Sequence, residues 1–181
     1  MRNIKTPATI EDLYKVEGKA ELVDGEIITM SPSGPMHGRA AARVFLNLLT
    51  YEAAAGWGHA VPDNVGFVVN LPRRKSFSPD AGYYVGEVGM GFVDGAPIFA
   101  VEVRSEDDYG PAAERRMAAK RADYFAAGTQ VVWDVDLLGD DTVRVYRADN
   151  PTEPTVYRRG EEAEAEPALP GWRMQVDDLF R

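Results

Sequence analysis

Apolar and polar positions alternate along the chain with periods that predict both helices and strands. Between residues 36 and 55, Ala41, Val44 and Leu48 recur at spacings of three and four, which is typical of an amphipathic helix. A second helix is predicted over 111–127, because Pro111 stands near its first turn and Gly128 follows its end. Apolar stretches predict strands at 65–71, 80–85, 98–104, 130–135 and 142–146. We expect the first three strands to form an antiparallel meander.

Both ends of the chain carry local signals of their own. Thr9 and Asp12 have the spacing of a capping box and predict a short helix that reaches about residue 15. Asp24-Gly25 lies between apolar stretches at 21–23 and 26–30, which predicts a hairpin, since both turn positions need a positive φ. Residues 169–176 predict a last strand, followed by a short turn that ends at Phe180.

The order of these elements predicts an α/β fold. One helix, three strands, a second helix and a further strand imply a mixed central sheet with helices packed on it. A length of 181 residues favours one domain. Within it we expect a core at about 36–147, an N-terminal helix and hairpin at 9–30, and C-terminal strands at 155–181.

Composition excludes several classes of protein. The chain has no cysteine, which rules out disulfides, thiolate nucleophiles, iron–sulfur clusters and cysteine-containing zinc sites. It has no stretch resembling a signal peptide, and no apolar run near the ~18 residues needed to cross a bilayer. We therefore expect a cytoplasmic protein without a membrane partner.

The net charge limits how the chain can bind nucleic acid. Twenty Lys and Arg against 29 Asp and Glu give −9, which argues against coating a polyanion by bulk charge. Part of this acidity lies in the segment 149–166. Any contact with phosphate is therefore expected to be local.

Two carboxylates are candidates for chemistry. Glu102 interrupts the apolar run 97–104, where desolvation costs several kcal/mol unless a partner such as a metal ion compensates it. Asp80 opens the preceding strand, so antiparallel pairing would bring it beside Glu102. Hard cations such as Mg²⁺ prefer oxygen ligands, and the pair therefore predicts a metal site. The alternatives are a strand-end Glu102 that pairs with Arg104 or solvent, and an Asp80 that only makes a turn.

A lysine is the third candidate. Lys120 interrupts the inward stripe that Ala113, Met117 and Tyr124 form on the second helix, so it faces the sheet or a cleft. An ammonium group near two carboxylates could orient water and stabilise phosphoryl charge. Alternatively, Lys120 only covers apolar surface with its aliphatic stem.

Asp80 and Glu102 on neighbouring strands, with a lysine nearby, resemble the PD-(D/E)XK nuclease superfamily. More narrowly, the chain resembles the Uma-type family of restriction-endonuclease-like proteins, whose motifs run over nearly its whole length. Those motifs are Glu21 to Glu26 before a Ser-Pro turn and His37, Ser78-Pro79-Asp80, Val101-Glu102-Val103 with Ser105, Lys120-x₃-Tyr124-x₃-Gly128, residues 132–136, and Leu169-Pro170-Gly171. Each motif alone is weak, but their order and spacing together are specific.

The resemblance implies a function and a set of roles. It implies a PD-(D/E)XK restriction-endonuclease-like core with an N-terminal hairpin, and a Mg²⁺- or Mn²⁺-dependent endonuclease that hydrolyses DNA. Asp80 and Glu102 would bind the metal with the Val103 carbonyl, and Lys120 would assist the attacking water. His37 would lie at the catalytic site, although a lone histidine is more often a structural residue than a catalytic one.

One position departs from the superfamily pattern. The usual E-x-K motif would put lysine at 104, but the chain has Arg104, which stays protonated and cannot act as a general base. In the Uma-type family that the chain resembles, the functional lysine comes from the following helix, so the resemblance assigns the lysine role to Lys120. Arg104 is expected either to hold a phosphate or to pair with Glu102 in an inactive site. Glu21 is either a further carboxylate of the site or a solvated strand residue.

DNA contacts are expected from a basic segment just before the acidic motif. Arg73, Arg74 and Lys75 could bind phosphates locally, or form an ordinary solvated loop. Because two symmetric sites cut both strands most simply, we expect a homodimer. Two other functions remain open: a catalytically inactive nuclease-fold protein that acts as a binding or assembly module, and an unrelated acidic α/β protein.

Overall fold

A six-stranded mixed sheet forms the centre of the computed structural model, which describes residues 6–181. Its strands are ordered β11-β10-β9-β8-β6-β3. In chain order they are β3 (His59–Val61), β6 (Ala81–Tyr84), β8 (Phe99–Val103), β9 (Val131–Asp136), β10 (Thr142–Arg147) and β11 (Asn150–Arg158). β8 and β9 pair in parallel, whereas the other neighbours are antiparallel. The predicted α/β class with a mixed central sheet is thus confirmed.

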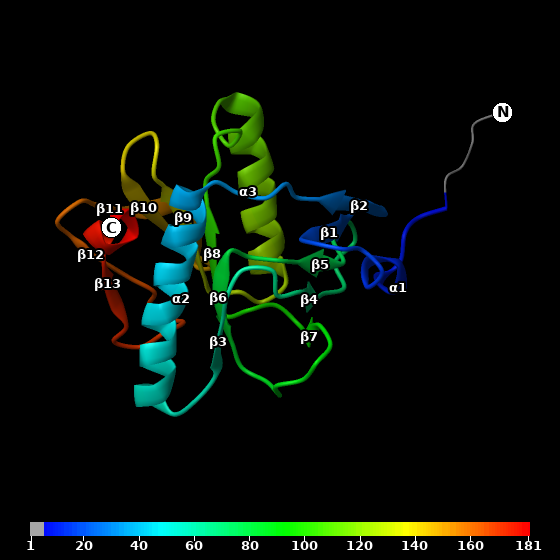
Figure 1. Cartoon of the computed structure of the whole chain (residues 1–181), viewed down its shortest axis with the longest axis horizontal. Coiled ribbons are helices and arrows are strands. Elements are labelled where there is room, and N and C mark those ends of the chain that lie inside the picture. Colours follow the sequence, from blue (N-terminus) through cyan, green and yellow to red (C-terminus); the bar gives the residue numbers. More distant parts are fainter. Residues whose placement is uncertain (1–5) are drawn as a thin grey trace.

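Two long helices pack on opposite faces of this sheet, and β6 and β8 lie between them (Figure 1). Helix α2 (Pro35–Ala55) buries Val44 and Leu48 against one face, and α3 (Pro111–Ala126) buries Tyr124 against the other. Successive strand residues point to opposite faces, so Val101 joins the α2 core while Ala100 joins the α3 core. Both helix predictions are confirmed to within one residue of their predicted ends.

The N-terminal elements form as their local signals predict. Helix α1 (Ile10–Leu13) has a capping box between Thr9 and Asp12. Strands β1 (Ala20–Val23) and β2 (Glu26–Thr29) form an antiparallel hairpin, with φ of 52° at Asp24 and 74° at Gly25. Glycine is favoured at such angles because it lacks a Cβ.

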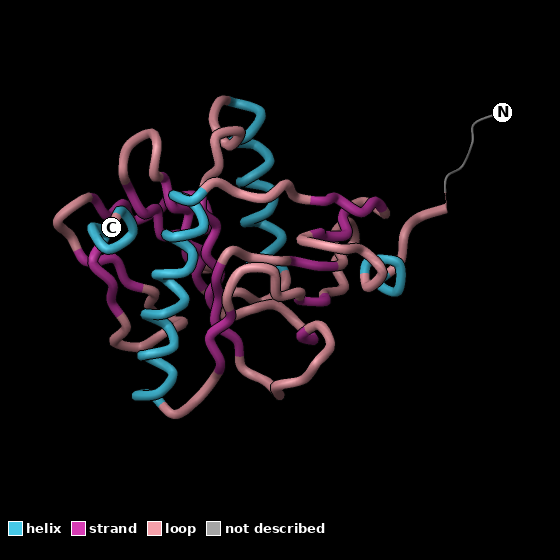
Figure 2. Tube along the Cα trace, in the orientation of Figure 1, coloured by secondary structure: helices cyan, strands magenta, loops and turns pink. Residues whose placement is uncertain are grey.

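The predicted meander is only partly correct. β6 and β8 are antiparallel neighbours, but residues 65–71 contribute only β4 (Phe67–Val68), which lies in a separate sheet with β5 (Ser76–Phe77) and β7 (Val93–Asp94). The other neighbour of β6 is β3. Phe67 is fully buried with Tyr84 and Tyr124, and this packing holds β4 over the α3 face. In Figure 2 the three short strands lie among long loops beside the hairpin.

The C-terminal segment differs from the prediction in its boundaries. β11 begins at Asn150 and includes Pro151 and Pro154, which an edge strand tolerates because it has one unpaired side. β12 (Glu162–Glu164) pairs with β13 (Arg173–Gln175), followed by the 3₁₀ helix η1 (Val176–Phe180). The strand predicted over 169–176 is therefore correct only for 173–175.

None of the helices within residues 6–181 combines the length and the apolar character required to span a bilayer.

Candidate active site

A cleft of about 1140 Å³ opens beside the end of β8. The hairpin, the segment that joins β2 to α2, the loop after β8 and one face of α3 all contribute to its walls. Among its lining residues are Asp80, Glu102, Lys120 and His37. Four residues that the sequence singles out thus share one cavity, although they come from four separate parts of the chain.

Strand pairing brings the two candidate carboxylates together. β6 pairs with β8 so that Ala81 faces Val101, and the same register continued by one residue puts Asp80 opposite Glu102. The Asp80 backbone N–H donates to the Val101 carbonyl at 3.0 Å. The Val103 N–H in turn donates to Asp80 Oδ2 at 2.7 Å, which fixes the carboxylate against β8.

Asp80 is buried and carries a negative charge. Lys19 Nζ lies 2.5 Å from its Oδ1, and His37 Nε2 lies 3.3 Å from its Oδ2. Burial alone would raise the pKa of Asp80, but the hydrogen bond from His37 and the ammonium group of Lys19 hold that pKa well below its usual range. The same contact with Asp80 raises the pKa of His37.

Glu102 lies on the α3 face of β8 and is bound by two residues of that helix. Lys120 Nζ donates to its Oε2 at 2.9 Å, and the Tyr124 hydroxyl donates to its Oε1 at 2.7 Å. Burial, with the nearby carboxylates of Asp80 and Glu21, raises the pKa of Glu102 in spite of Lys120. A cation bound beside Glu102 would favour its ionised form and so oppose this rise in pKa.

Lys120 bridges two carboxylates. Its Nζ lies 2.9 Å from Glu102 Oε2 and 2.9 Å from Glu21 Oε1. Burial alone would lower the pKa of Lys120, but these two carboxylates raise it above its ordinary value. Lys120 is therefore a cation at neutral pH.

Glu21 connects the hairpin to the rest of the site. Its carboxylate accepts the Ser78 backbone N–H at 2.9 Å and Arg74 Nη1 at 2.6 Å, besides its contact with Lys120. Although burial acts in the opposite direction, Lys120 and Arg74 lower the pKa of Glu21. Of the two readings of Glu21 that the sequence left open, the geometry favours membership of the site, because the side chain is buried and ion-paired.

The basic segment 73–75 divides between the interior and the surface. Arg74 is 5% exposed and also pairs with Asp123 of α3 at 2.8 Å. Arg73 is exposed beside Asp24, and Lys75 Nζ donates to the Asn70 side chain at 2.8 Å. Of the three, only Arg74 lines the cleft.

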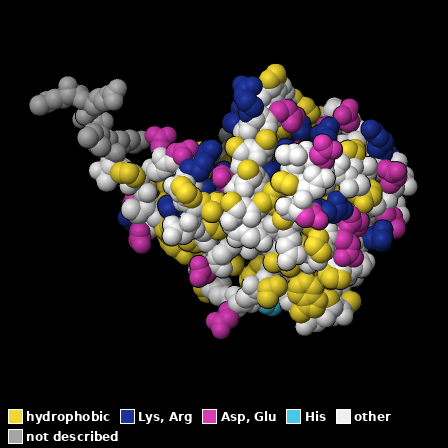
Figure 3. Space-filling model, turned by 180° about the vertical axis from the view of Figure 1, so that it is seen from behind, with side chains coloured by type: hydrophobic (Ala, Val, Ile, Leu, Met, Phe, Trp, Pro, Cys, Tyr) yellow, Lys and Arg dark blue, Asp and Glu magenta, His cyan; other side chains and the backbone are white. Residues whose placement is uncertain are grey.

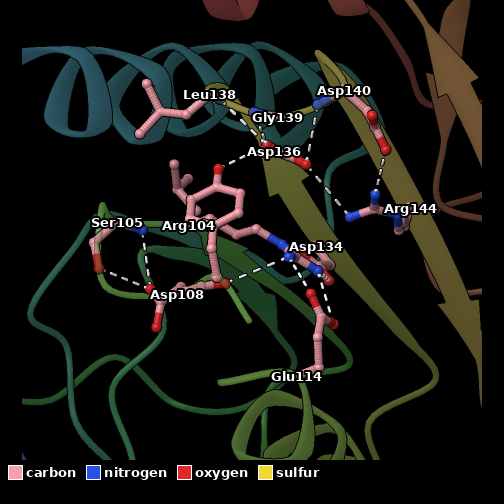
Figure 4. Close-up of polar contacts among 12 residues, drawn as sticks. Arg104, Ser105, Asp108, Glu114, Asp134, Asp136, Leu138, Gly139, Asp140 and Arg144 are labelled. Atoms are coloured by element: carbon pink, nitrogen blue, oxygen red, sulfur yellow. Dashed lines mark hydrogen bonds and ion pairs between the residues drawn. The ribbon is translucent and has the colours of Figure 1, made fainter. Parts of the chain in front are cut away.

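Arg104 lies at the centre of a second polar network, shown in Figure 4. Its Nε and Nη2 each lie 2.7 Å from a different oxygen of Asp134, and its Nη1 lies 2.5 Å from Glu114. Parallel pairing makes Glu102 the neighbour of Asp134, so Arg104 is close to the site. Among the described residues, its ion pairs are with Asp134 and Glu114 and not with Glu102.

Sequence reasoning missed two contacts of the site. Lys19 has no predicted role, and Tyr124 is predicted as part of the inward helix face and of the Lys120-x₃-Tyr124 motif but not as a partner of Glu102. A signal existed for both contacts. Lys19 lies two residues before Glu21, so the two side chains share a face if the strand begins before residue 21, and Tyr124 is one turn after Lys120.

The donors fit a hydrated hard cation. No group of three His, Asp or Glu side chains in residues 6–181 is arranged as a complete metal site. Mg²⁺, however, is commonly held by one or two carboxylates and keeps several waters. Asp80 and Glu102 supply two such carboxylates, and the ammonium group on Asp80 Oδ1 shows that this oxygen accepts a cation.

The mixed sheet and the helices on its two faces define an α/β protein with an acidic cleft beside β8. The chain is similar to a crystal structure described as a "putative nuclease belonging to DUF820" from Anabaena variabilis ATCC 29413, with a TM-score of 0.75 and 19% sequence identity. The match covers 96% of this chain and 98% of that one, and shows that the two share a fold.

Residues 7–177 match the model of the Uma2 family, which is described as "Putative restriction endonuclease". The chain therefore belongs to the Uma2 family, as its motifs predicted. No curated protein matches the chain.

Proposed function

We propose that the chain is a Mg²⁺- or Mn²⁺-dependent endonuclease that hydrolyses phosphodiester bonds in DNA. One observation carries the proposal: Asp80 faces Glu102 across two strands, and the Lys120 ammonium group lies 2.9 Å from Glu102 inside the cleft. Membership of the Uma2 family supports the same reaction class.

Asp80 and Glu102 would hold the metal, with the Val103 carbonyl as a third oxygen ligand. When bound, such an ion lowers the pKa of a water ligand and neutralises charge on the phosphoryl group. The Val103 N–H keeps Asp80 aligned, and the Tyr124 hydroxyl does the same for Glu102. Both carboxylates are thus oriented before any ligand arrives.

Lys120 acts as a fixed positive charge. Because Glu102 and Glu21 raise its pKa, it does not accept a proton from water at neutral pH. It positions the nucleophile through hydrogen bonds and stabilises negative charge on the phosphate. His37 acts at the same site by donating from Nε2 to Asp80, which keeps that carboxylate ionised.

Contacts with DNA are proposed first for Arg73 and Lys75, which are less buried than their neighbour Arg74. Arg74 and Arg104 could also bind phosphates, but each would first have to leave a buried carboxylate partner. Figure 3 shows Lys and Arg interspersed with Asp and Glu on the face seen from behind, without a continuous basic surface. The proposed binding is therefore local.

A second candidate function is a catalytically inactive nuclease-fold protein that serves as a binding or assembly module. The position of Arg104 favours this inactive module, because Arg104 replaces the usual lysine and forms ion pairs with Asp134 and Glu114. The two candidate functions differ in whether Mn²⁺ changes the melting temperature: the metal-dependent nuclease requires a Mn²⁺ site, and the inactive module does not. A site that binds Mn²⁺ only in the folded state raises the melting temperature.

Two further proposals concern the oligomeric state of the protein and its location in the cell. A homodimer would supply two symmetric sites for the two strands of a duplex. The lack of cysteine supports a cytoplasmic protein. Light scattering during gel filtration tests the first, and fractionation of the source cells tests the second.

The test of the proposed reaction is cleavage of supercoiled plasmid in Mg²⁺ or Mn²⁺. Asp80→Asn, Glu102→Gln and Lys120→Met should each lower the rate by about 100-fold or more, because each removes a charge at the reacting centre. Lys15→Met serves as a matched control, since Lys15 is an exposed lysine that pairs with Asp12 and does not line the cleft. Cleavage that persists in all three site variants would contradict the proposal.

A further inference from the structure

Lys19 has two carboxylate partners that come from different elements. Its Nζ lies 2.5 Å from Asp80 Oδ1, at the start of β6, and 2.7 Å from Asp63 Oδ1, in the loop after β3. The lysine side chain is 17% exposed and lines the cleft. In the proposed reaction this ammonium group neither binds the metal nor positions the water.

The two oxygens of Asp80 have different partners. Oδ2 receives the Val103 N–H and the His37 ring, whereas Oδ1 is contacted by Lys19. Oδ1 is therefore the oxygen best placed to turn toward a ligand in the cleft. A divalent cation and an ammonium group cannot both lie against Oδ1 without strong repulsion at such short distances.

Asp63 can keep its ion pair with the Lys19 ammonium group after that group leaves Asp80. Its side chain is 44% exposed, so this ion pair lies nearer to solvent than the pair with Asp80, whose side chain is 6% exposed. When Lys19 leaves Asp80, it can keep its contact with Asp63 and lose only one of its two ion pairs. This lowers the cost of moving the lysine.

Lys120 lacks such an alternative. Both of its carboxylates belong to the interior of the site, and Glu21 is 4% exposed and is also held by Arg74. The partners of the two lysines therefore differ: Lys120 lies between the buried Glu21 and the partly buried Glu102, whereas Lys19 links the buried Asp80 to the exposed Asp63.

We propose that Lys19 is an internal counter-ion of Asp80 that a divalent cation displaces, after which the ammonium group is held by Asp63. The proposal rests on the metal site of the proposed function. It assigns to the N-terminal hairpin segment a direct part in metal binding, because Lys19 competes with the metal for one oxygen.

The first experiment is calorimetric titration of Mn²⁺ into the whole chain without DNA. Lys19→Met should bind Mn²⁺ about fivefold more tightly than the wild type, because no internal cation has to leave Asp80. Lys15→Met makes the same change in net charge at an exposed lysine outside the cleft and should stay within about twofold. Equal or weaker binding by Lys19→Met, or no Mn²⁺ binding by either protein, would overturn the proposal.

The second experiment uses the wild-type chain, so it does not depend on a variant that folds. Lysines are labelled with an amine-reactive reagent, with and without Mg²⁺, and the labelled fraction of each is measured by mass spectrometry. The labelled fraction of Lys19 should rise several-fold in Mg²⁺, while that of the exposed Lys15 stays constant. An unchanged fraction at Lys19 would show that the lysine is not displaced, whatever the affinity of the variant.

These measurements separate the inference from the nuclease proposal. Tighter Mn²⁺ binding by Lys19→Met together with stronger labelling of Lys19 supports the displacement even if plasmid is never cut, in which case only the nuclease proposal fails. Plasmid cleavage that depends on Asp80, with neither effect at Lys19, overturns the displacement and leaves the nuclease proposal intact.

Discussion

Asp136 closes the turn that follows β9 with both of its carboxylate oxygens (Figure 4). Its Oδ1 accepts the Gly139 N–H at 2.8 Å and the Tyr109 hydroxyl at 2.7 Å, and its Oδ2 accepts the Asp140 N–H at 3.3 Å. A Cβ on Gly139 would lie 2.7 Å from Asp136 Oδ2, so the absence of a side chain there permits the close approach. The turn depends on the ionised carboxylate.

The hydrogen bonds of Asp136 predict that the free energy of unfolding decreases in acid. Burial would raise the pKa of Asp136, but the hydrogen bonds from Tyr109 and from backbone N–H groups lower it below its ordinary value. A carboxyl whose pKa is lower in the folded state stabilises the protein above the unfolded pKa of about 4, and this contribution disappears as pH falls through the folded value. Asp136→Asn should therefore lower the free energy of unfolding by about 1–3 kcal/mol at pH 7, and by less at pH 3.

Urea denaturation at several pH values between 3 and 7 measures this difference. The gap between wild type and Asp136→Asn should narrow as the pH falls. Asp149→Asn, a change at an exposed aspartate in the β10–β11 turn, should leave a small gap at every pH. A gap for Asp136→Asn that stays constant with pH would contradict the assigned role.

The site residues that could be predicted are those whose charge conflicts with their surroundings in the sequence. Glu102 stands in an apolar run and Lys120 interrupts an apolar helix face, so a physical reason for each was visible before the fold was known. Lys19 lies in the polar segment that follows α1 and creates no such conflict. Arg104 could not be paired correctly, because the partner Asp134 depends on the parallel register between β8 and β9.

At the scale of elements, the hairpin of β1 and β2 connects the N-terminal segment to the cleft. Lys19 precedes β1 and Glu21 lies within it, so one strand face carries a positive and a negative side chain into the site. The hairpin is tied down by the Asp24 N–H, which donates to Arg73 O, and by the Lys75 N–H, which donates to Leu22 O. A shift of this hairpin would move both side chains together.

Gly25→Ala tests the hairpin as a unit. Gly25 has φ of 74°, and a Cβ there would lie 2.9 Å from the Pro7 Cβ. Strain in the left-handed region costs about 1–2 kcal/mol for residues other than glycine, and the contact with Pro7 adds to it. The melting temperature should therefore fall, and Mn²⁺ affinity should change with it because Lys19 and Glu21 move.

Gly89→Ala is the matched control. Gly89 is exposed, lies outside the cleft, has no positive φ and has no heavy atom within 4 Å of its added Cβ, so the melting temperature of this variant should stay close to that of the wild type. Equal melting temperatures for both variants would show that the turn adapts to a side chain. In that case the hairpin could not be the rigid support of the site.

The elements that could be predicted carry their signals locally. Both long helices have a proline at the start and a glycine at or just after the end, and the hairpin has Asp24-Gly25. Strands β3, β4, β5 and β7 have two or three residues each, too few for a recognisable alternation. Their pairing depends on tertiary packing, as with Phe67 against Tyr84 and Tyr124. That is why 65–71 was assigned to the wrong sheet.

At the scale of the whole molecule, the proposed function requires the cleft to accept a polyanion although the chain carries a net charge of −9. The loop after β8 brings Glu106 and Asp107 to the cleft wall, and both are exposed. The exposed Arg115 and Arg116 lie on the first turns of α3, and Arg116 also lines the cleft. Acidic and basic groups thus lie side by side at the entrance, and under the proposed function the acidic loop would oppose the approach of DNA.

Neutralising this loop should strengthen DNA binding. Glu106→Gln with Asp107→Asn removes two negative charges beside the path of the phosphates, so affinity for a short duplex should rise about three- to tenfold at low salt. The gain should shrink as salt increases, because ions screen charges that are exposed to solvent. Fluorescence anisotropy at several salt concentrations measures both effects, with Ca²⁺ in place of Mg²⁺ so that the duplex is less readily cut.

Asp149→Asn with Glu153→Gln makes the same change in net charge outside the cleft wall, at exposed positions near the start of β11. If the total charge limits DNA binding, both double variants should gain equally. If the entrance limits it, only the loop variant should gain, and its advantage should be largest below about 0.1 M salt, where the screening length exceeds about 10 Å. Equal gains would place the barrier in the charge of the molecule as a whole, and would remove the reason to assign DNA to this cleft rather than to another face.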